Sequence, residues 1–206
     1  MVKVTALFWD VGGVILSNGW DRAAREQASR KFKLDWEDFQ DRHELASPAY
    51  ETGQITLEEY LKRTIFYRAR RFTPKQVKEF MFAQSRQLSG SRAIVGGLAR
   101  TRKYFQATIN NEGMELNLHR IERFGLRKDF DAFFSSCFVN ARKPEQAIYR
   151  IALEVTQRDP RECVFVDDRP LNLECACRLG IRTIHYRTAA LLRADLARHG
   201  VACEPD

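Results

Sequence analysis

The sequence predicts an α/β protein built on a doubly wound parallel sheet, with a small helical domain inserted into it. Helical patterns separate the later members of five short apolar runs, and alternating strands and helices are typical of such sheets. Several runs are apolar without alternation, as expected for parallel strands that helices cover on both faces. The predicted strands are residues 4–9, 104–109, 133–139, 163–166 and 183–186, and the predicted helices between the later strands are 144–156 and 171–179.

The stretch between the first two strands differs, because it holds no convincing strand but several helix starts. Asp35 can cap a helix that begins at the next residue. Thr56 and Thr73 each open a capping box, and Pro74 occupies the first helical position of the second one. The sequence therefore predicts several short helices here.

This pattern divides the chain into two units. We expect a helical cap over residues 17–89, inserted after the first strand, and a core formed by residues 1–16 and 90–206. The glycine-containing segments 17–19 and 89–91 are the expected hinges between the two units.

The composition is that of a globular protein. Of the 206 residues, 44% are hydrophobic and 30% are charged, which is enough for one sizeable core and a second small unit. No apolar stretch approaches the roughly 20 residues of a membrane span. Because the N-terminus leads directly into a predicted strand, we expect no signal peptide and a cytoplasmic protein.

The net charge of +7 raises the question of nucleic-acid binding. Apart from a cluster at 68–71, the basic residues are spread along the chain, and no recognition motif for DNA or RNA is present. We expect a solvated basic face or an attraction for anionic metabolites, and no specific nucleic-acid partner. The odd number of cysteines argues against a disulfide framework, and the spacing of Cys175 and Cys177 lacks the usual zinc pattern. The oligomeric state is not readable from the sequence.

An acidic residue ends the first apolar run. Asp10 follows the predicted strand directly, and Gly12 and Gly13 come immediately after it. Open α/β sheets place their chemistry at the C-terminal tips of strands, and glycines let a ligand approach the backbone closely. Asp10 could accept a phosphoryl group as a nucleophile, or it could simply cap the next turn.

A second apolar run ends in two acids, Asp167 and Asp168. Adjacent carboxylates repel each other unless a cation relieves them, and Mg²⁺ prefers oxygen ligands of this kind. The alternative is a pair of exposed turn residues. Asn172 lies four residues after Asp168 and could orient that second carboxylate, or it could serve an ordinary helix start.

Polar residues also follow the second predicted strand, and a lysine precedes a predicted helix. Asn110 and Asn111 could donate to phosphate oxygens, although asparagine is common in turns. We expect Pro144 to fix the start of a helix, so that Lys143 projects from its N-terminal end. There the lysine charge and the helix dipole together favour an anion.

In this order, the features place the chain close to a known family. A doubly wound sheet brings all of them to one edge, and nearly the whole chain resembles the haloacid dehalogenase (HAD) superfamily, in the subgroup whose helical cap follows the first strand. The residues that resemble its four motifs are, in order, 10–14, Asn110–Asn111, Lys143–Pro144 and Asp167–Asp168.

The resemblance implies a Rossmann-like HAD core and a Mg²⁺-dependent phosphatase that acts on a small phosphorylated metabolite through an aspartyl phosphate. Asp10 and Lys143 are then the catalytic residues. The phosphate-binding residues are Asn110, Asn111 and Gly13, and the metal ligands are Asp10, the Gly12 carbonyl, Asp167 and Asp168.

Two positions depart from the family pattern. Most phosphatases of the superfamily carry an acid–base aspartate two residues after the nucleophile, where this chain has Gly12, and Ser or Thr where it has Asn110. General acid–base help is worth about 10²–10⁴ in rate, so we expect a slow enzyme, or one restricted to leaving groups that need no proton, such as sugar 1-phosphates and acyl phosphates. A cap residue could also substitute, and Asp21 and His43 are the candidates.

Two other functions are compatible with the same residues. A HAD-fold binding or regulatory protein could keep the metal site and lose turnover, which Gly12 leaves open. A 2-haloacid dehalogenase uses the same nucleophile without a metal, but that class lacks the acidic pair found here at Asp167 and Asp168. The acidic pair therefore favours phosphate over halide.

Overall fold

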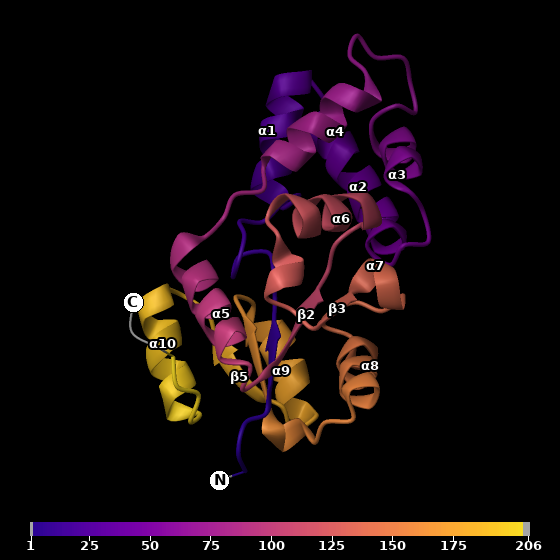
Figure 1. Ribbon diagram of the computed structural model, residues 1–206. Coiled ribbons are helices and arrows are strands. Elements are labelled where there is room, and N and C mark those ends of the chain that lie inside the picture. Colours follow the sequence, from indigo (N-terminus) through magenta and orange to yellow (C-terminus); the bar gives the residue numbers. More distant parts are fainter. Residues whose placement is uncertain (1, 204–206) are drawn as a thin grey trace.

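Five parallel strands form a single sheet in the order β3-β2-β1-β4-β5, which confirms the predicted fold class. The computed structural model describes residues 2–203, and Figure 1 shows the sheet in the lower half of the molecule. The strands are β1 (Ala6–Trp9), β2 (Phe105–Asn110), β3 (Ala132–Ser135), β4 (Cys163–Asp167) and β5 (Arg182–His185).

Helices cover both faces of the sheet, so β1 is buried throughout. Leu7 and Trp9 pack into the hydrophobic cluster on one face, with helices α5 and α10 and part of α6. Ala6 and Phe8 point to the opposite face, where α8 and α9 pack. The bounds of these helices are α5 (Ser89–Thr101), α6 (Met114–Arg123), α8 (Gln146–Thr156), α9 (Pro170–Arg178) and α10 (Ala189–Arg198), and the short helices are η1 (Leu126–Lys128), α7 (Ser136–Val139) and η2 (Pro160–Glu162).

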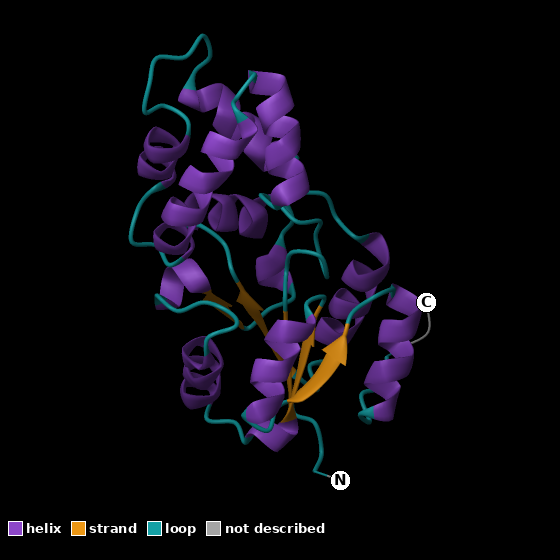
Figure 2. Cartoon of the chain, turned by 180° about the vertical axis from the view of Figure 1, so that it is seen from behind, coloured by secondary structure: helices purple, strands orange, loops and turns teal. Residues whose placement is uncertain are grey.

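Four helices between β1 and α5 form a separate layer, which we call the helical insertion. They surround their own hydrophobic cluster, which contacts the rest of the protein through Leu116 of α6. Figure 2 shows this layer of helices above the strands. The helices are α1 (Arg22–Phe32), α2 (Trp36–Glu51), α3 (Leu57–Thr64) and α4 (Pro74–Ala83).

The helix starts of the insertion follow the sequence closely. The Asp35 side chain accepts a hydrogen bond from the Asp38 amide, and Thr73 forms a complete capping box with Gln76, as predicted. Thr56 accepts from the Glu59 amide at 3.2 Å, but the Glu59 carboxylate accepts from Arg63 instead of returning to the cap. The capping box at Thr56 therefore has only one of its two hydrogen bonds.

Two antiparallel segments connect the insertion to the sheet. The Ser17 amide donates to the Arg86 carbonyl at 2.8 Å, and the Leu88 amide donates to the Ile15 carbonyl at 3.0 Å. The expected second hinge, 89–91, lies in the first turn of α5, so the connection itself is the segment 84–88. The division into a cap at 17–89 and a two-part core stays a prediction.

Two element predictions are wrong in part. The run 133–139 is a strand only to Ser135, and Ser136–Val139 forms the short helix α7, because an apolar run of this length does not distinguish strand from helix. Helix α8 begins at Gln146 with Glu145 as its N-cap, two residues later than Pro144 indicated.

Among the described residues, no helix is both long and apolar enough to cross a membrane. The five cysteines are free thiols, which confirms that the chain has no disulfide framework.

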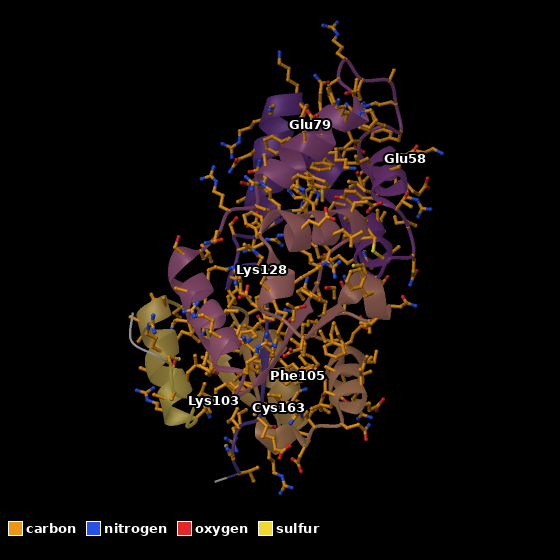
Figure 3. The ribbon with its side chains drawn as sticks, in the orientation of Figure 1. Glu58, Glu79, Lys103, Phe105, Lys128 and Cys163 are labelled. Atoms are coloured by element: carbon orange, nitrogen blue, oxygen red, sulfur yellow. The ribbon has the colours of Figure 1, made fainter. Side chains whose placement is uncertain are left out.

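The strands run toward the helical insertion. Phe105 and Cys163 are the first residues of β2 and β4, and Figure 3 places both at the end of the sheet far from the insertion. Glu58 and Glu79 mark the outer side of the insertion in the same view. The C-terminal strand ends, which carry the predicted site residues, therefore face the insertion.

Candidate active site

The predicted residues come from neighbouring strand ends. In the sheet, Trp9 pairs with Thr108 of β2 and with Val166 of β4. This register brings the residues that follow, Asp10 and Asp167, to one level.

A cavity of about 510 Å³ lies between these strand ends and the helical insertion. Its sheet side includes Asp10, Gly12, Asn111, Lys143, Arg169 and Asn172, and its insertion side includes Asn18, Trp20, Asp21, Arg25, His43, Tyr50 and Glu51.

A buried lysine joins two of the carboxylates. The Lys143 Nζ lies 2.9 Å from Asp10 Oδ1 and 2.6 Å from Asp167 Oδ2, and the residue is only 4% exposed. Burial lowers the pKa of Lys143, but Asp10 and Asp167 outweigh it and leave that pKa raised. The lysine is therefore a fixed positive charge beside Asp10.

Asp10 is fixed at the tip of β1. Its amide donates to the Val166 carbonyl at 2.8 Å, and its Oδ1 accepts from the Val11 amide at 2.7 Å. Burial raises the pKa of Asp10, and Lys143 opposes that shift. The carboxylate is thus desolvated and oriented toward the ammonium group, as a nucleophile for an anionic substrate requires.

Gly13 makes room for the acidic pair. Its φ is +78°, and a Cβ at this position would overlap the Asp168 carboxylate. Both constraints require glycine here, and the group that comes close to its backbone is the Asp168 carboxylate.

The two acids after β4 have different surroundings. Asp167 is fully buried, and its Oδ1 accepts from the Arg169 amide at 2.7 Å. Asn172 donates to both oxygens of Asp167, so the expectation that it orients Asp168 is wrong. Helix α9 starts at Pro170, and Asn172 in its first turn is buried.

Three carboxylates form a donor set that fits a divalent cation. Asp10, Asp167 and Asp168 offer oxygens within 4.8 Å of one another, and Mg²⁺ takes such oxygen ligands. The Asp168 Oδ1 is buried and has no hydrogen-bond partner, and burial followed by Asp167 raises the pKa of Asp168. A cation would partner that oxygen and relieve the repulsion.

The asparagines after β2 are held by other parts of the protein. Asn110 donates to Asn117 at 3.2 Å and accepts from Ser135 at 2.9 Å, beneath the cavity floor. Asn111 accepts from the Lys143 amide and donates to the Lys143 carbonyl, both at 2.8 Å. Phosphate binding by the two asparagines stays a prediction, whereas the structure gives Asn111 a role in positioning Lys143.

Lys143 does not project from a helix N-terminus, because α8 begins three residues later. The Lys143–Pro144 peptide bond is cis, and Asn111 holds the lysine backbone beside the end of β2. The lysine charge therefore acts through its direct contacts with Asp10 and Asp167 rather than through a helix dipole.

The space beside Gly12 is occupied. A Cβ on Gly12 would lie 2.8 Å from Asn18 Oδ1 and 3.8 Å from Arg120 Nη1. Arg120 is buried, forms an ion pair with Glu112, and also donates to the Ser17 carbonyl. A buried arginine–glutamate pair thus lies near Gly12, the position at which the sequence departs from the family pattern that it resembles.

The sequence reasoning missed Arg120 and Glu112. A signal for Arg120 was available, because Leu116, Asn117, Arg120 and Ile121 form the buried stripe of α6, and polar residues on an inward helical face indicate a buried network. Glu112 has no comparable signal, because it lies in the loop after β2.

Neither cap candidate is arranged as a proton donor. The Asp21 side chain accepts from the Ala24 amide and caps α1. The Trp20 indole donates to the Tyr60 hydroxyl at 2.9 Å, and His43 Nδ1 lies 2.8 Å from the same oxygen. Burial followed by Arg25 lowers the pKa of His43 to about 3, so its imidazole is neutral near pH 7.

Comparison with known proteins places this geometry in context. A sequence profile of the haloacid dehalogenase-like hydrolases matches residues 4–176. The chain is 28% identical over 160 residues to flavin mononucleotide hydrolase 1 of Arabidopsis thaliana, an alignment that covers 78% of this chain and 64% of that protein. It is 42% identical over 69 residues to bifunctional epoxide hydrolase 2 of Rattus norvegicus, covering 33% of this chain and 12% of that protein.

The fold also matches solved structures. A HAD family enzyme from Bacteroides thetaiotaomicron superposes with a TM-score of 0.79 at 22% identity, covering 93% of this chain and 100% of the other. A complex of that enzyme with magnesium and inorganic phosphate has a TM-score of 0.74 at 21% identity, covering 90% and 95%. The chain thus spans less than two thirds of the curated relatives named above, but nearly the full length of its structural neighbours.

Proposed function

The chain belongs to the haloacid dehalogenase-like hydrolases, and from this premise we propose that it is a Mg²⁺-dependent phosphatase. In this proposal it hydrolyses a small phosphorylated metabolite through an aspartyl phosphate on Asp10. The observation that carries the proposal is the position of Lys143, which bridges Asp10 and Asp167 beside the unpartnered oxygen of Asp168. Similarity to a flavin mononucleotide hydrolase, and the fold shared with an enzyme crystallised with magnesium and phosphate, support it.

The residues divide the chemistry between them. Asp10 attacks phosphorus in line, forming a P–O bond as the bond to the leaving group breaks. Water then attacks the phosphorus, the bond between the Asp10 oxygen and phosphorus breaks, and inorganic phosphate and the free Asp10 carboxylate are released. Lys143 neutralises charge on the transferring oxygens, with Asn110, Asn111 and the Gly13 backbone proposed as further donors. Asp10, the Gly12 carbonyl, Asp167 and Asp168 would hold Mg²⁺, which would supply the positive charge that screens the nucleophile from its anionic substrate.

The absence of a side chain at Gly12 restricts the leaving group. Asp21 caps a helix and His43 is neutral with its Nδ1 occupied, so neither supplies a proton in this arrangement. We therefore propose substrates whose leaving group departs unprotonated, such as sugar 1-phosphates and acyl phosphates. A cytoplasmic location and the lack of a nucleic-acid partner stay predictions.

Asp10→Asn tests the nucleophile. We expect it to reduce the turnover of p-nitrophenyl phosphate by more than about 10³-fold, while circular dichroism and thermal unfolding show an intact fold. Asp159→Asn is the matched control, because Asp159 is an exposed carboxylate that pairs with Arg161 outside the cavity. Retained turnover in Asp10→Asn would rule out the nucleophile assignment.

Two alternatives predict different results in the same assay. A dehalogenase would keep full activity in EDTA, whereas the proposed phosphatase would lose it and recover with added Mg²⁺. A binding protein that lost turnover, which the occupied space beside Gly12 makes a specific candidate, would give no activity above the Asp10→Asn background across a panel of phosphorylated metabolites.

A further inference from the structure

We propose that the cavity receives a second anionic group of the substrate, a carboxylate or a further phosphate, at Arg25 of the helical insertion. The inference rests on the proposed phosphatase function, and it narrows the substrate to molecules with two anionic ends. One end would lie beside Asp10 and Lys143, and the other beside Arg25.

Arg25 is a buried cation whose contacts are all neutral. The residue is only 8% exposed. Its Nη1 donates to the Trp20 carbonyl at 2.6 Å, and its Nε donates to Gln40 Oε1 at 3.2 Å. Across residues 2–203, no carboxylate lies within ion-pair distance of its guanidinium. A buried charge without a counter-charge is unfavourable, so an anion at this position would be stabilised.

The other buried arginine of the cavity shows the difference. Arg120 has the Glu112 carboxylate as a direct partner, so its charge is already compensated. Arg25 has only a carbonyl and an amide oxygen, which leave donors of a five-donor guanidinium without a charged partner. Of the two buried arginines that line the cavity, only Arg25 therefore lacks a carboxylate partner among the described residues.

Positive charge is also in excess around Arg25. Two carboxylates act on Arg25 without contacting it, Asp21 and Glu51, and Glu51 forms an ion pair with Arg142 at 3.1 Å. Burial raises the pKa of Glu51, while Arg142, Arg169 and Arg25 all act to lower it. Three guanidinium groups thus share two carboxylates, and an added anion would bring the charges closer to balance.

A neutral donor adds to this side of the cavity. The Tyr50 hydroxyl is buried, has no hydrogen-bond partner, and belongs to the residue next to Glu51 on α2. A buried hydroxyl normally has a partner, and a ligand oxygen would supply one. Glu112 and Glu115 act on this hydroxyl, so it suits a neutral oxygen of the ligand, whereas the Arg25 guanidinium suits the anionic end.

The cavity has room for a molecule that reaches both ends. Its volume of about 510 Å³ includes Lys143 on the sheet side and Arg25 on the insertion side, and pockets of this size hold small molecules. Ligands of graded length therefore test the inference directly.

The experiment compares alkylphosphonates with ω-carboxyalkylphosphonates of the same chain length, from two to five methylene groups. Affinities for the wild-type protein are measured by calorimetry with Mg²⁺ present, and as competitive inhibition of p-nitrophenyl phosphate hydrolysis. At one or two chain lengths, we expect the carboxylate to improve affinity by at least about tenfold. An α,ω-bisphosphonate series then shows whether a carboxylate or a phosphate is the preferred second anion.

Variants test whether Arg25 provides the gain in affinity from the second anionic group. In Arg25→Gln we expect the gain from the carboxylate to fall below about threefold, and Arg25→Lys to restore part of it because it keeps the charge. Arg30→Gln is the matched control, since Arg30 lies on the same helix, has a side chain 77% exposed and pairs only weakly with Glu26. The control should keep the full gain.

The wild-type series alone can overturn the inference, even if Arg25→Gln does not fold. Should no chain length gain affinity from its second anion, or should the gain persist in Arg25→Gln, the assignment is wrong. If p-nitrophenyl phosphate hydrolysis still depends on Asp10 in that case, the phosphatase proposal stands by itself. If alkylphosphonates do not bind and no Asp10-dependent hydrolysis occurs, the phosphatase proposal fails and the second-anion site fails with it.

Discussion

The two sides of the cavity compensate their charges differently. On the sheet side, Lys143 contacts Asp10 and Asp167 at 2.9 Å and 2.6 Å, so one cation serves two carboxylates, and the Asp168 Oδ1 has no partner. On the insertion side, Arg25 is also buried but contacts only neutral oxygens. The sheet side therefore lacks positive charge, whereas the Arg25 guanidinium lacks a carboxylate partner. In the proposed function, the strand ends would carry out the reaction and the insertion would select the substrate.

The largest test of this contrast is the loss of Lys143. Lys143→Met leaves two buried carboxylates without their cation, and removal of one partner from a buried pair costs roughly 3–5 kcal/mol. We expect the free energy of unfolding in urea to fall by about this amount, and kcat/KM for p-nitrophenyl phosphate to fall by about 10²–10³-fold. Lys128→Met, at an exposed lysine of η1, is the control. Unchanged kcat/KM in Lys143→Met would remove the lysine from the reaction.

Arg120 tests whether the two sides are joined. It contacts Glu112 after β2 and the Ser17 carbonyl at the entry to the insertion. Arg120→Met should lower the free energy of unfolding by roughly 3 kcal/mol, because Glu112 stays buried without a cation. A double variant with Glu112→Gln should recover part of that loss in a thermodynamic cycle. Purely additive effects would show that the pair is not coupled.

Gly13 tests the cation site on the sheet side. Gly13→Ala places a methyl group against the Asp168 carboxylate and strains a φ of +78°. We expect the Mg²⁺ concentration for half-maximal activity to rise by at least about tenfold, since Asp168 must move. Gly125→Ala is the control, because Gly125 has a comparable φ of +60° and a Cβ there would have its nearest atoms at 4.0 Å. This variant should strain the backbone but leave the Mg²⁺ concentration for half-maximal activity unchanged. Equal Mg²⁺ dependence in both variants would contradict the metal assignment.

His43 gives the smallest expected effect, on the insertion side. Burial followed by Arg25 lowers its pKa from 6.5 to about 3, so the unfolded chain binds more protons than the folded chain between these values. Stability is therefore retained above about pH 6.5 and decreases as the pH falls toward 3. His43→Gln should flatten the dependence of Tm on pH over this window. An NMR titration of His43 with a pKa near 6.5 would contradict the assignment.

The same contrast governs what the sequence could predict. At the strand ends, short local patterns carry the information: Asp10 closes an apolar run, and Asp167 and Asp168 close another. Parallel strands in register then bring these residues together without long side chains. The grouping of the metal-fitting carboxylates could therefore be anticipated from the chain alone, whereas the position of Lys143 depends on its contacts with Asn111.

The insertion side could not be predicted in this way. Arg25, Glu51 and Tyr50 come from two helices, and their meeting depends on how those helices pack. The prediction that Asn172 orients Asp168 is wrong for a similar reason. Which of the two aspartates Asn172 contacts depends on the geometry of the first turn of α9. Local periodicity predicts where a helix begins, but not which distant side chain its residues contact.

The side-chain amide of Asn111 grips the backbone of Lys143 from both sides, at 2.8 Å to its N–H and to its C=O. It thereby imitates one rung of strand pairing beyond the last residue of β2. The Lys143 ammonium group is thus positioned by the residue that follows β2, and not by helix α8, which follows it in the chain. Shortening or exchanging α8 during evolution or engineering should consequently leave the Lys143 charge in place. Loss of the Asn111 side-chain amide should instead allow Lys143 to move.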